Sequence, residues 1–242
     1  MKFLLALILI MVLVASGCTS QTISSDNTQA TGDDNVQPAG DSDSSSVLAE
    51  CEEKNYPDTR NYCYSTKADE TSNPDLCGMI TSETSRDACF RKLGIKLNDI
   101  SLCDKVNTPH LKDGCIELVS INTENPDGCD RVVDEDERAT CFSEIAKQTG
   151  DASLCDRITS SDESEYNTVL NKKDGCYYSV ATNTNDIAPC YKFWDDYAPR
   201  RNECLCKIAI NTLNESIAAL IDTGSAAYYE CKREWPGTWP LD

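Results

Sequence analysis

Residues 103–129, CDKVNTPHLKDGCIELVSINTENPDGC, contain three cysteines that are separated by 12 and then by 14 positions. The same alternation continues in both directions, so a unit of 26 residues repeats along most of the 242-residue chain. We call the first cysteine of each unit A and the second B. The A/B pairs are Cys51/Cys63, Cys77/Cys89, Cys103/Cys115, Cys129/Cys141, Cys155/Cys176 and Cys190/Cys204.

Only one of the two steps between cysteines varies in length. Each B is followed by the next A after 14 residues, whereas the fifth and sixth A-to-B steps are nine and two residues longer than the others. We therefore expect a tight connection from B to the next A, and a loop between A and B that tolerates insertions.

Apolar residues recur around the cysteines at spacings of three and four, which place side chains on one face of a helix. One residue after B the chain has Tyr64, Phe90, Ile116, Phe142, Tyr177 and Leu205. Ten residues after B it has an Asn or Asp, whose side-chain oxygen can accept from the free amides of a helix start. These residues are Asn73, Asp99, Asn125, Asp151, Asp186 and Asn214. The pattern predicts a helix of about two turns through A, a loop, and a second helix that starts just before B.

Hairpins this short bury too little surface to fold singly, so neighbours must stack on one another. The sequence therefore predicts an all-α fold in residues 48–242, with disulfide-stapled helical hairpins of period 26 stacked as a short α-solenoid. We expect about seven hairpins, the last of them degenerate because Ala218 stands where A should be. The domain resembles α-helical solenoid repeat proteins, although it matches no named repeat family.

Two disulfide connectivities fit the cysteine series. Pairing of A with B in one hairpin, and pairing of B with the A of the next hairpin, would each join cysteines across an antiparallel turn. The last unit favours pairing within hairpins. Its B cysteine, Cys231, lacks an A partner, and Cys206 is the one repeat-domain cysteine outside the series. Pairing within hairpins plus Cys206 with Cys231 uses all 14 cysteines of the domain. Pairing between hairpins would leave Cys51, Cys204, Cys206 and Cys231 without partners.

The N-terminus has a pattern typical of exported proteins. Lys2 precedes an apolar run at residues 3–14, which is short for a membrane span, and residues 15–18, ASGC, follow it. This segment resembles the signal peptide and lipobox of prokaryotic lipoprotein precursors, although the first lipobox position, usually leucine, is alanine. The resemblance implies that residues 1–17 are removed and that Cys18 is lipid-modified as the mature N-terminus. The alternative is an ordinary signal peptide cleaved nearby, or an uncleaved anchor.

Residues 18–47 consist almost wholly of Ser, Thr, Asp, Asn, Gln and Gly after the first cysteine, and have too few apolar side chains to fold. We expect them to form a disordered tether. Many cysteines in an exported chain are typical of a disulfide framework outside the cytoplasm. The predicted location is therefore extracytoplasmic, with the lipid anchor as the only contact with the cell membrane.

The chain carries 41 acidic and 22 basic residues, a formal net charge of −19. This balance disfavours nucleic acid and anionic lipid surfaces as partners, and it is also common where acidic residues only confer solubility. The densest acidic runs, residues 134–137 and 162–165, lack the spaced ligands and the glycine of a calcium loop. No metal site is expected.

Against this acidic background, a basic residue stands three positions before B in each of the six pairs. This basic column consists of Arg60, Arg86, Lys112, Arg138, Lys173 and Arg201. In a solenoid it could line one face and bind an extended acidic ligand or polymer. The alternative, which we favour, is a repeated salt bridge, for example to Asp104, Asp130 and Asp156 just after the A cysteines, because surface charges often serve only local pairing.

Enzymatic chemistry has little support in the sequence. The single histidine, His110, lies in an A-to-B loop, and no nucleophile-elbow, zinc-helix or phosphate-loop motif occurs. Cys204 and Cys206 form a C-x-C that could mark a redox pair, but pairing of Cys206 with Cys231 explains it better. We therefore expect no catalytic residues and no cofactor.

Aromatic residues gather near the C-terminus, at Tyr228, Tyr229, Trp235 and Trp239. Since a solenoid must cover its last apolar face, a terminal cap is the expected role, and a patch that binds glycan or peptide is the alternative.

Together these features predict a membrane-anchored extracytoplasmic lipoprotein whose repeats bind or scaffold a surface protein or an envelope polymer. The alternatives are a cell-envelope enzyme, such as a carbohydrate hydrolase with carboxylates in a groove, and a purely structural surface spacer. The sequence leaves the partner, the membrane and the oligomeric state open.

Overall fold

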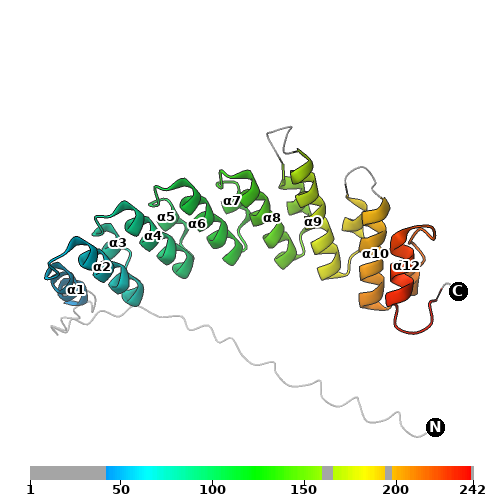
Figure 1. Cartoon of the computed structure of the whole chain (residues 1–242), viewed down its shortest axis with the longest axis horizontal. Helices are drawn as coiled ribbons and strands as arrows, with labels where there is room; N and C mark the ends of the chain where they lie inside the picture. Colours follow the sequence, from blue (N-terminus) through cyan, green and yellow to red (C-terminus); the bar gives the residue numbers. More distant parts are fainter. Residues whose placement is uncertain (1–41, 160–165, 194–197, 241–242) are drawn as a thin grey trace, which may run out of the picture. The chain divides into compact units, whose positions relative to one another are not determined.

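The computed structural model describes residues 42–159, 166–193 and 198–240, which all belong to one compact unit, Gly40–Asp242. Every regular element in these ranges is a helix, and the helices follow one another as a row of hairpins (Figure 1). They are α1 (Ser42–Glu52), α2 (Pro57–Thr71), α3 (Asp75–Gly78), α4 (Glu83–Leu97), α5 (Ile100–Cys103), α6 (Pro109–Asn122), α7 (Pro126–Cys129), α8 (Glu135–Thr149), η1 (Ala152–Arg157), α9 (Tyr166–Thr184), η2 (Ala188–Tyr191), α10 (Ala198–Thr212), α11 (Glu215–Ala218) and α12 (Ala226–Glu234). The predicted all-α fold of stacked helical hairpins is confirmed.

Hairpins two to six each join a short helix that carries A to a long helix that carries B. Successive long helices pack against each other from α2 to α12, so each hairpin touches its neighbours along the chain. The helix lengths differ from those expected. The short helices α3, α5 and α7 have four residues, which is about one turn rather than two. The long helices α4 and α8 have 15 residues and begin six residues before B, not just before it.

The long helices begin early because helix-start residues lie in the segments that were expected to be loops. The side chains of Ser82 and Asp134 accept hydrogen bonds from backbone N–H groups at the starts of α4 and α8. Pro57 and Pro109 stand at the starts of α2 and α6, where a missing N–H costs nothing. The A-to-B loop is correspondingly short.

The junction from each long helix to the next short helix is built the same way six times. The Asn or Asp ten residues after B accepts from the backbone N–H two residues ahead at 2.9–3.2 Å in all six cases, as predicted. The residue just before it has a left-handed backbone, with φ between 51° and 75°. These left-handed residues are Ser72, Asn98, Glu124, Gly150, Asn185 and Leu213. A residue of this conformation ends a helix and turns the chain sharply.

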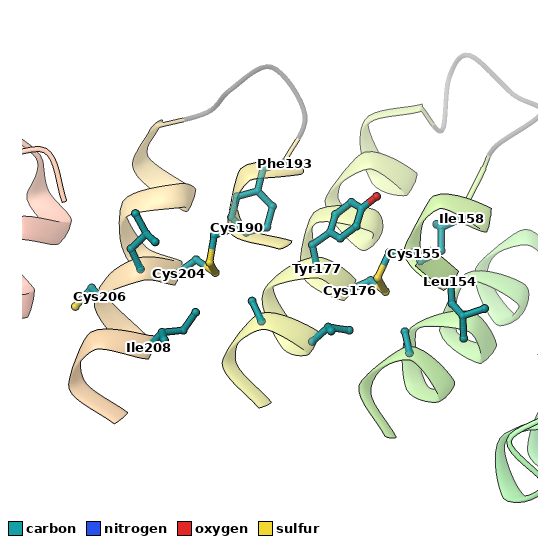
Figure 2. Close-up of a cluster of buried hydrophobic side chains, with 14 of the residues drawn as sticks. Leu154, Cys155, Ile158, Cys176, Tyr177, Cys190, Phe193, Cys204, Cys206 and Ile208 are labelled. Atoms are coloured by element: carbon teal, nitrogen blue, oxygen red, sulfur yellow. A yellow bond between two sulfur atoms is a disulfide. The ribbon is translucent and has the colours of Figure 1, made fainter. Parts of the chain in front are cut away.

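The core is a thin layer between the short and the long helices. The predicted apolar residues one position after B are all buried, at 0–6% exposure. Figure 2 shows one of them, Tyr177, beside the disulfide of its own hairpin. The core therefore repeats with the same period as the cysteines.

Six disulfides lie in the core layer and join A to B within each hairpin, as predicted, with Cα–Cα distances of 5.5–5.8 Å. They are Cys51–Cys63, Cys77–Cys89, Cys103–Cys115, Cys129–Cys141, Cys155–Cys176 and Cys190–Cys204. The last two are drawn in Figure 2. These bonds place the folded part of the protein in a non-reducing, extracytoplasmic compartment.

Helix α1 corrects the predicted boundary between tether and repeat domain. It begins at Ser42, so residues 42–47, which were assigned to the tether, are helical. The reason is tertiary: Leu48 packs against the first core cluster, and Cys51 is bonded to Cys63 in α2. The predicted signal peptide, Cys18 and the rest of the tether lie outside the described residues. No helix within the described ranges is long and apolar enough to cross a membrane.

Candidate binding surface

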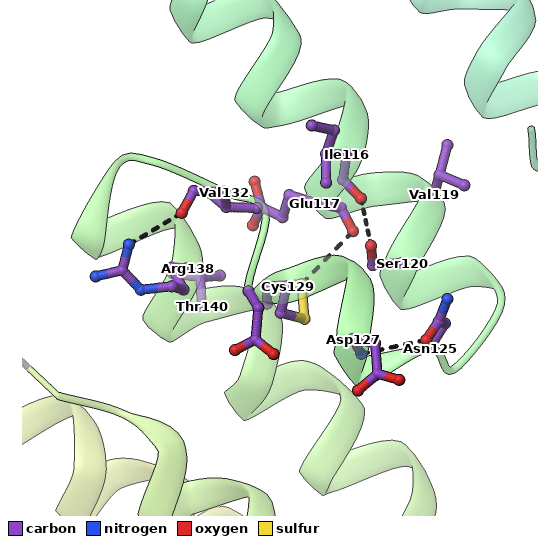
Figure 3. The surroundings of a disulfide bond; sticks show 12 residues. Ile116, Glu117, Val119, Ser120, Asn125, Asp127, Cys129, Val132, Arg138 and Thr140 are labelled. Carbon is purple, nitrogen blue, oxygen red and sulfur yellow. Dashed lines mark hydrogen bonds between the residues drawn. A yellow bond between two sulfur atoms is a disulfide. The ribbon is translucent and has the colours of Figure 1, made fainter. Parts of the chain in front are cut away.

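The basic column lies against the ends of the short helices. Arg60, Arg86 and Arg138 each donate a hydrogen bond to a backbone carbonyl three positions after A, at 3.4, 3.4 and 2.9 Å. Figure 3 shows the contact of Arg138 with Val132. The last carbonyls of a helix have no partner within it, so these side chains satisfy groups that the fold leaves open.

Two further column residues pair with carboxylates. Lys173 Nζ lies 3.6 Å from Asp156 Oδ1, and an Arg201 guanidinium nitrogen lies 3.6 Å from Asp222 Oδ2. The side chains of Arg138, Lys173 and Arg201 are only 21–28% exposed. Local pairing therefore accounts for most of the column, and its binding of a ligand stays a prediction.

Two of the three salt bridges expected for the column are wrong. Asp104 pairs with Arg131, and Asp130 pairs with Arg157. Each of these arginines stands two residues after A of the following hairpin. Arg60, Arg86 and Arg138 turn toward the first helix of their own hairpin, and the carboxylate after A pairs with the next hairpin instead. Arg201 differs, because it reaches Asp222 of the next hairpin. These ion pairs therefore bridge hairpins rather than staple one.

A second contact between hairpins comes from a polar residue two positions before B. Five of these six residues are Asn or Asp and are only 0–8% exposed: Asn61, Asp87, Asp113, Asp174 and Asn202. Asp87 accepts from the backbone N–H groups of Asn107 at 3.2 Å and Thr108 at 2.8 Å. Asp113 accepts from the N–H of Asp134 at 2.9 Å. The donors lie just before the next long helix, so each carboxylate fixes the following hairpin. This role was not predicted from the sequence, although the recurrence of Asn or Asp two residues before B signals it.

Two carboxyls on neighbouring long helices, Glu117 on α6 and Glu137 on α8, have raised pKa values. Burial is the main cause for both. The charges of Glu137 and Asp134 also raise the pKa of Glu117, and those of Asp134 and Asp113 raise that of Glu137. Glu137 Oε2 is buried and has no hydrogen-bond partner within the described part of the chain.

Three of the surface cavities in the described part of the chain lie between neighbouring hairpins. One cavity, of about 290 Å³, is lined by residues of α8 and α9. Another, of about 300 Å³, is lined by residues of α9 and α10. The third, of about 230 Å³, lies between η1 and η2. None of the three is lined by a residue of the basic column, by Glu117 or by Glu137. Two of the cavities each have two carboxylates in their lining, Asp174 with Glu203 and Asp156 with Asp186, and the enzyme alternative stays a prediction.

The bonded cysteines are structural and form no part of a binding surface. Cys89 on α4 and Cys141 on α8 show this: they are 3% and 0% exposed, and each is bonded to the A cysteine of its own hairpin, Cys77 or Cys129, with a Cα–Cα distance of 5.6 Å. Cys89 and Cys141, which are among the predicted site residues, therefore stabilise the fold through their disulfides and offer no free group to a ligand.

The predicted Cys206–Cys231 disulfide is not formed in the structure, where both residues are buried free thiols whose side chains contact each other. The six disulfides of the series join the two arms of one hairpin, whereas these cysteines lie on neighbouring long helices, α10 and α12. Burial raises the pKa of both thiols, which disfavours the reactive thiolate and gives the redox alternative no support.

The register of neighbouring long helices places the thiol of Cys231 against both the side chain and the backbone of Cys206. Cys231 donates from its thiol to the backbone carbonyl of Cys206 at 3.7 Å. Two other B cysteines repeat this placement, because the sulfur atoms of Cys115 and Cys141 each lie 3.9 Å from a backbone carbonyl of the preceding long helix. Figure 3 shows Glu117, whose backbone carbonyl lies 3.9 Å from the Cys141 sulfur. In this register the sulfur of a B cysteine lies beside the backbone of the preceding long helix as well as beside another cysteine side chain.

The C-terminal aromatic residues pack as the expected cap. Trp239 is 4% exposed and belongs to the largest core cluster. Its indole N–H donates to the Tyr228 hydroxyl at 3.2 Å, and its ring meets those of Tyr228 and Trp235 edge to face at 5.5 and 5.4 Å. Tyr229 remains 65% exposed.

Other sequence features have local roles. His110 is exposed and lies in the first turn of α6, not in a loop as expected. Residues 134–137 form the capped start of α8, and residues 162–165 lie outside the described ranges. Within those ranges no group of three His, Cys, Asp or Glu residues is placed to hold a metal ion.

The chain matches no known family model, and no curated protein and no solved structure is similar to it. Its own repeats are therefore the standard of comparison, because each contact occurs several times in one chain.

Proposed function

We propose that this protein is an extracytoplasmic lipoprotein, anchored to the cell membrane through lipid-modified Cys18, whose repeats bind or scaffold a surface protein or an envelope polymer. The lipobox at residues 15–18 supports the anchor. The proposal includes no catalytic step and no cofactor.

The observation that carries the binding role is the double bridge between successive hairpins. Buried carboxylates such as Asp87 hold the start of the next long helix, and ion pairs such as Asp130–Arg157 hold the next short helix. Side chains on neighbouring hairpins therefore keep fixed relative positions. A preorganised surface loses little conformational entropy on binding, which suits recognition of an extended partner.

The anchor is tested by changing Cys18→Ala and separating membranes from soluble material. The wild-type protein should sediment with membranes, and its mature N-terminal peptide should carry the mass of a lipid. The variant should leave the membrane fraction. Membrane retention of Cys18→Ala would rule out lipid anchoring at this residue.

The binding role is tested by cross-linking the protein on intact cells and identifying linked partners by mass spectrometry. A reproducible partner linked to the repeat domain is expected. A variant with all six column residues changed to Gln, with its fold checked by circular dichroism, separates the column from other surfaces. Loss of the cross-link assigns binding to the column. Absence of any partner with the wild-type protein would favour the structural spacer.

A further inference from the structure

One exposed asparagine lies in a sequence pattern that directs glycan attachment. Asn214, Glu215 and Ser216 form an Asn-x-Ser sequon, which requires a hydroxyl two residues after the asparagine and any residue except proline between them. No other asparagine of the 242-residue chain meets this pattern. All three residues are exposed, and the disulfides place them outside the cytoplasm, where sequons are modified.

The sequon stands at a position where the repeat needs only an oxygen atom. Asn214 is ten residues after B, and its Oδ1 accepts from the backbone N–H groups of Ser216 at 3.0 Å and Ile217 at 3.3 Å. In other hairpins the carboxylates of Asp99 and Asp151 make the same cap. The cap therefore makes no use of the amide nitrogen of Asn214.

The two groups that define the sequon are free. Within the described ranges, neither Asn214 Nδ2 nor the Ser216 hydroxyl makes a hydrogen bond. At the equivalent turn of the fifth hairpin, by contrast, the Ser153 hydroxyl is bonded to Asp151 Oδ1. Residues 211–216 are all exposed. A sugar on Nδ2 would therefore displace no packed side chain, and it would leave Oδ1 in the cap.

The other asparagine caps are not sequons. Asn73 and Asn125 make the same hydrogen bond, but each is followed by a proline and then by an aspartate. Both features prevent glycan transfer, since proline is excluded at the middle position and the hydroxyl is missing. The capping geometry is thus common to the hairpins, whereas an acceptor amide with its hydroxyl occurs at Asn214 alone.

A second observation comes from the residue before Asn214. Leu213 is 59% exposed. The other hairpins have a polar residue or glycine at this position, nine residues after B: Ser72, Asn98, Glu124, Gly150 and Asn185. Sugar rings have faces of C–H groups, and covering exposed apolar surface is favourable. The one apolar residue at this position therefore lies where a glycan on Asn214 would shield it.

We propose that Asn214 carries an N-linked glycan, transferred from a lipid-linked sugar phosphate by a membrane glycosyltransferase. A bond forms between Asn214 Nδ2 and the anomeric carbon of the sugar, and the bond from that carbon to the phosphate oxygen breaks. Nδ2 loses one proton, the lipid phosphate leaves with the electron pair, and no group is oxidised or reduced. The inference goes beyond the proposed function, because it needs export but neither the lipid anchor nor a binding partner.

The experiment is mass spectrometry of the mature protein isolated from the cells that make it. Trypsin releases residues 208–232 as one peptide, because Lys207 and Lys232 are its nearest cleavage sites around Asn214. This peptide should carry the mass of a sugar chain, and electron-transfer fragmentation, which leaves the sugar attached, should place it on Asn214. An unmodified peptide, or a sugar on Ser216 instead, would overturn the proposal.

Three variants remove the sequon and keep the cap. Asn214→Asp removes Nδ2 and leaves the oxygen that Asp99 uses elsewhere. Glu215→Pro creates the Asn-Pro start that the second and fourth hairpins already have. Ser216→Ala removes the hydroxyl but keeps the N–H that donates to Asn214. Each should lose the sugar completely, whereas the matched control Glu215→Ala should keep it.

Melting curves that match an unglycosylated wild-type sample show that the variants fold. Retention of the sugar in Asn214→Asp or in Ser216→Ala would overturn the proposal. The result is also separable from the proposed function. An unmodified Asn214 in a protein that still cross-links to a partner would remove the glycan and keep the binding module. A modified Asn214 in a protein without a partner would do the reverse.

Discussion

The wholly buried carboxylate of Asp87 accepts hydrogen bonds from the backbone N–H and the hydroxyl of Thr108 in the following hairpin, at 2.8 and 2.6 Å. Burial by itself would raise the pKa of Asp87, but the bonds from Thr108 and from the Asn107 amide outweigh it, and the pKa lies below the ordinary 3.8. The ionised form is therefore the one that holds two hairpins together.

Asp87→Asn should lower the free energy of unfolding by about 1–3 kcal/mol at pH 7, because an amide accepts more weakly than a carboxylate and its NH₂ group faces donors. A lowered folded pKa stabilises the fold above the unfolded pKa of about 3.8, and that contribution is lost as the pH falls through the folded value. The difference between variant and wild type should therefore shrink below pH 3.8. Urea unfolding at several pH values measures it, with the exposed Asp58→Asn as control. A pH-independent difference would refute the role of the charge.

Gly128→Ala should destabilise the fold by about 1–3 kcal/mol, since a Cβ at this position would lie 2.0 Å from Ser120 Oγ and 2.9 Å from Ser120 Cβ. Adding Ser120→Gly removes both atoms, so the two changes should couple favourably, although a glycine inside α6 itself costs about 0.5–1 kcal/mol. The matched control is Gly114→Ala, where a Cβ meets nothing within 4 Å and helix propensity should add about 0.5–1 kcal/mol. A double-mutant cycle from urea midpoints with no coupling between residues 120 and 128 would contradict this packing.

Leu213→Gly should stabilise the protein by about 0.5–1 kcal/mol, because Leu213 has φ of 51° and a left-handed backbone is strained for any residue with a Cβ. The side chain is 59% exposed, so little burial is lost. The converse change at the equivalent position, Gly150→Ala, should destabilise, since φ is 75° and the new Cβ would lie 3.0 Å from Thr184 Cγ2. Thermal melts of the two variants that shift in the same direction would argue against a shared left-handed turn.

Glu137→Gln should raise stability at pH 7. The folded pKa of Glu137 is raised by burial and by the charges of Asp134 and Asp113. A raised carboxyl pKa favours the fold only while the group is protonated, so that contribution is present below the ordinary 4.5 and is lost as the pH rises through the folded value. The gain from Gln should therefore appear at neutral pH and vanish below pH 4.5. Glu144→Gln on the same helix is the control, and equal effects of the two changes would contradict the assignment.

The sequence predicted the parts of the fold that repeat with a distinctive residue type. Cysteines at fixed steps indicated the hairpins and six disulfides, and Asn or Asp ten residues after B indicated the caps. The left-handed backbone nine residues after B was not predicted, because only one of the six residues at this position, Gly150, is a glycine. Helix lengths were wrong because Ser82, Asp134 and the prolines at 57 and 109 were not recognised as helix starts.

Contacts between hairpins were harder to predict, since they depend on which way a side chain turns. Three of the six column residues, Arg60, Arg86 and Arg138, face carbonyls of their own hairpin, which could not be told from a free charged stripe. Two residues before B, the fourth hairpin has Ala139 where the other five have Asn or Asp. The hairpin that follows it is the one with nine extra residues between A and B. Cys206 was placed beside Cys231 correctly, and the two thiols contact each other without a bond.

A disulfide map of the folded ectodomain, alkylated before denaturation and digested without reduction, tests the stapled-hairpin account most directly. The account predicts six links, each between A and B of one hairpin, with Cys206 and Cys231 protected in the folded state and alkylated only after unfolding. A Cys206–Cys231 bond would contradict the thiol assignment alone. Links from B to the next A, such as Cys89 to Cys103 or Cys141 to Cys155, would contradict the hairpin architecture itself.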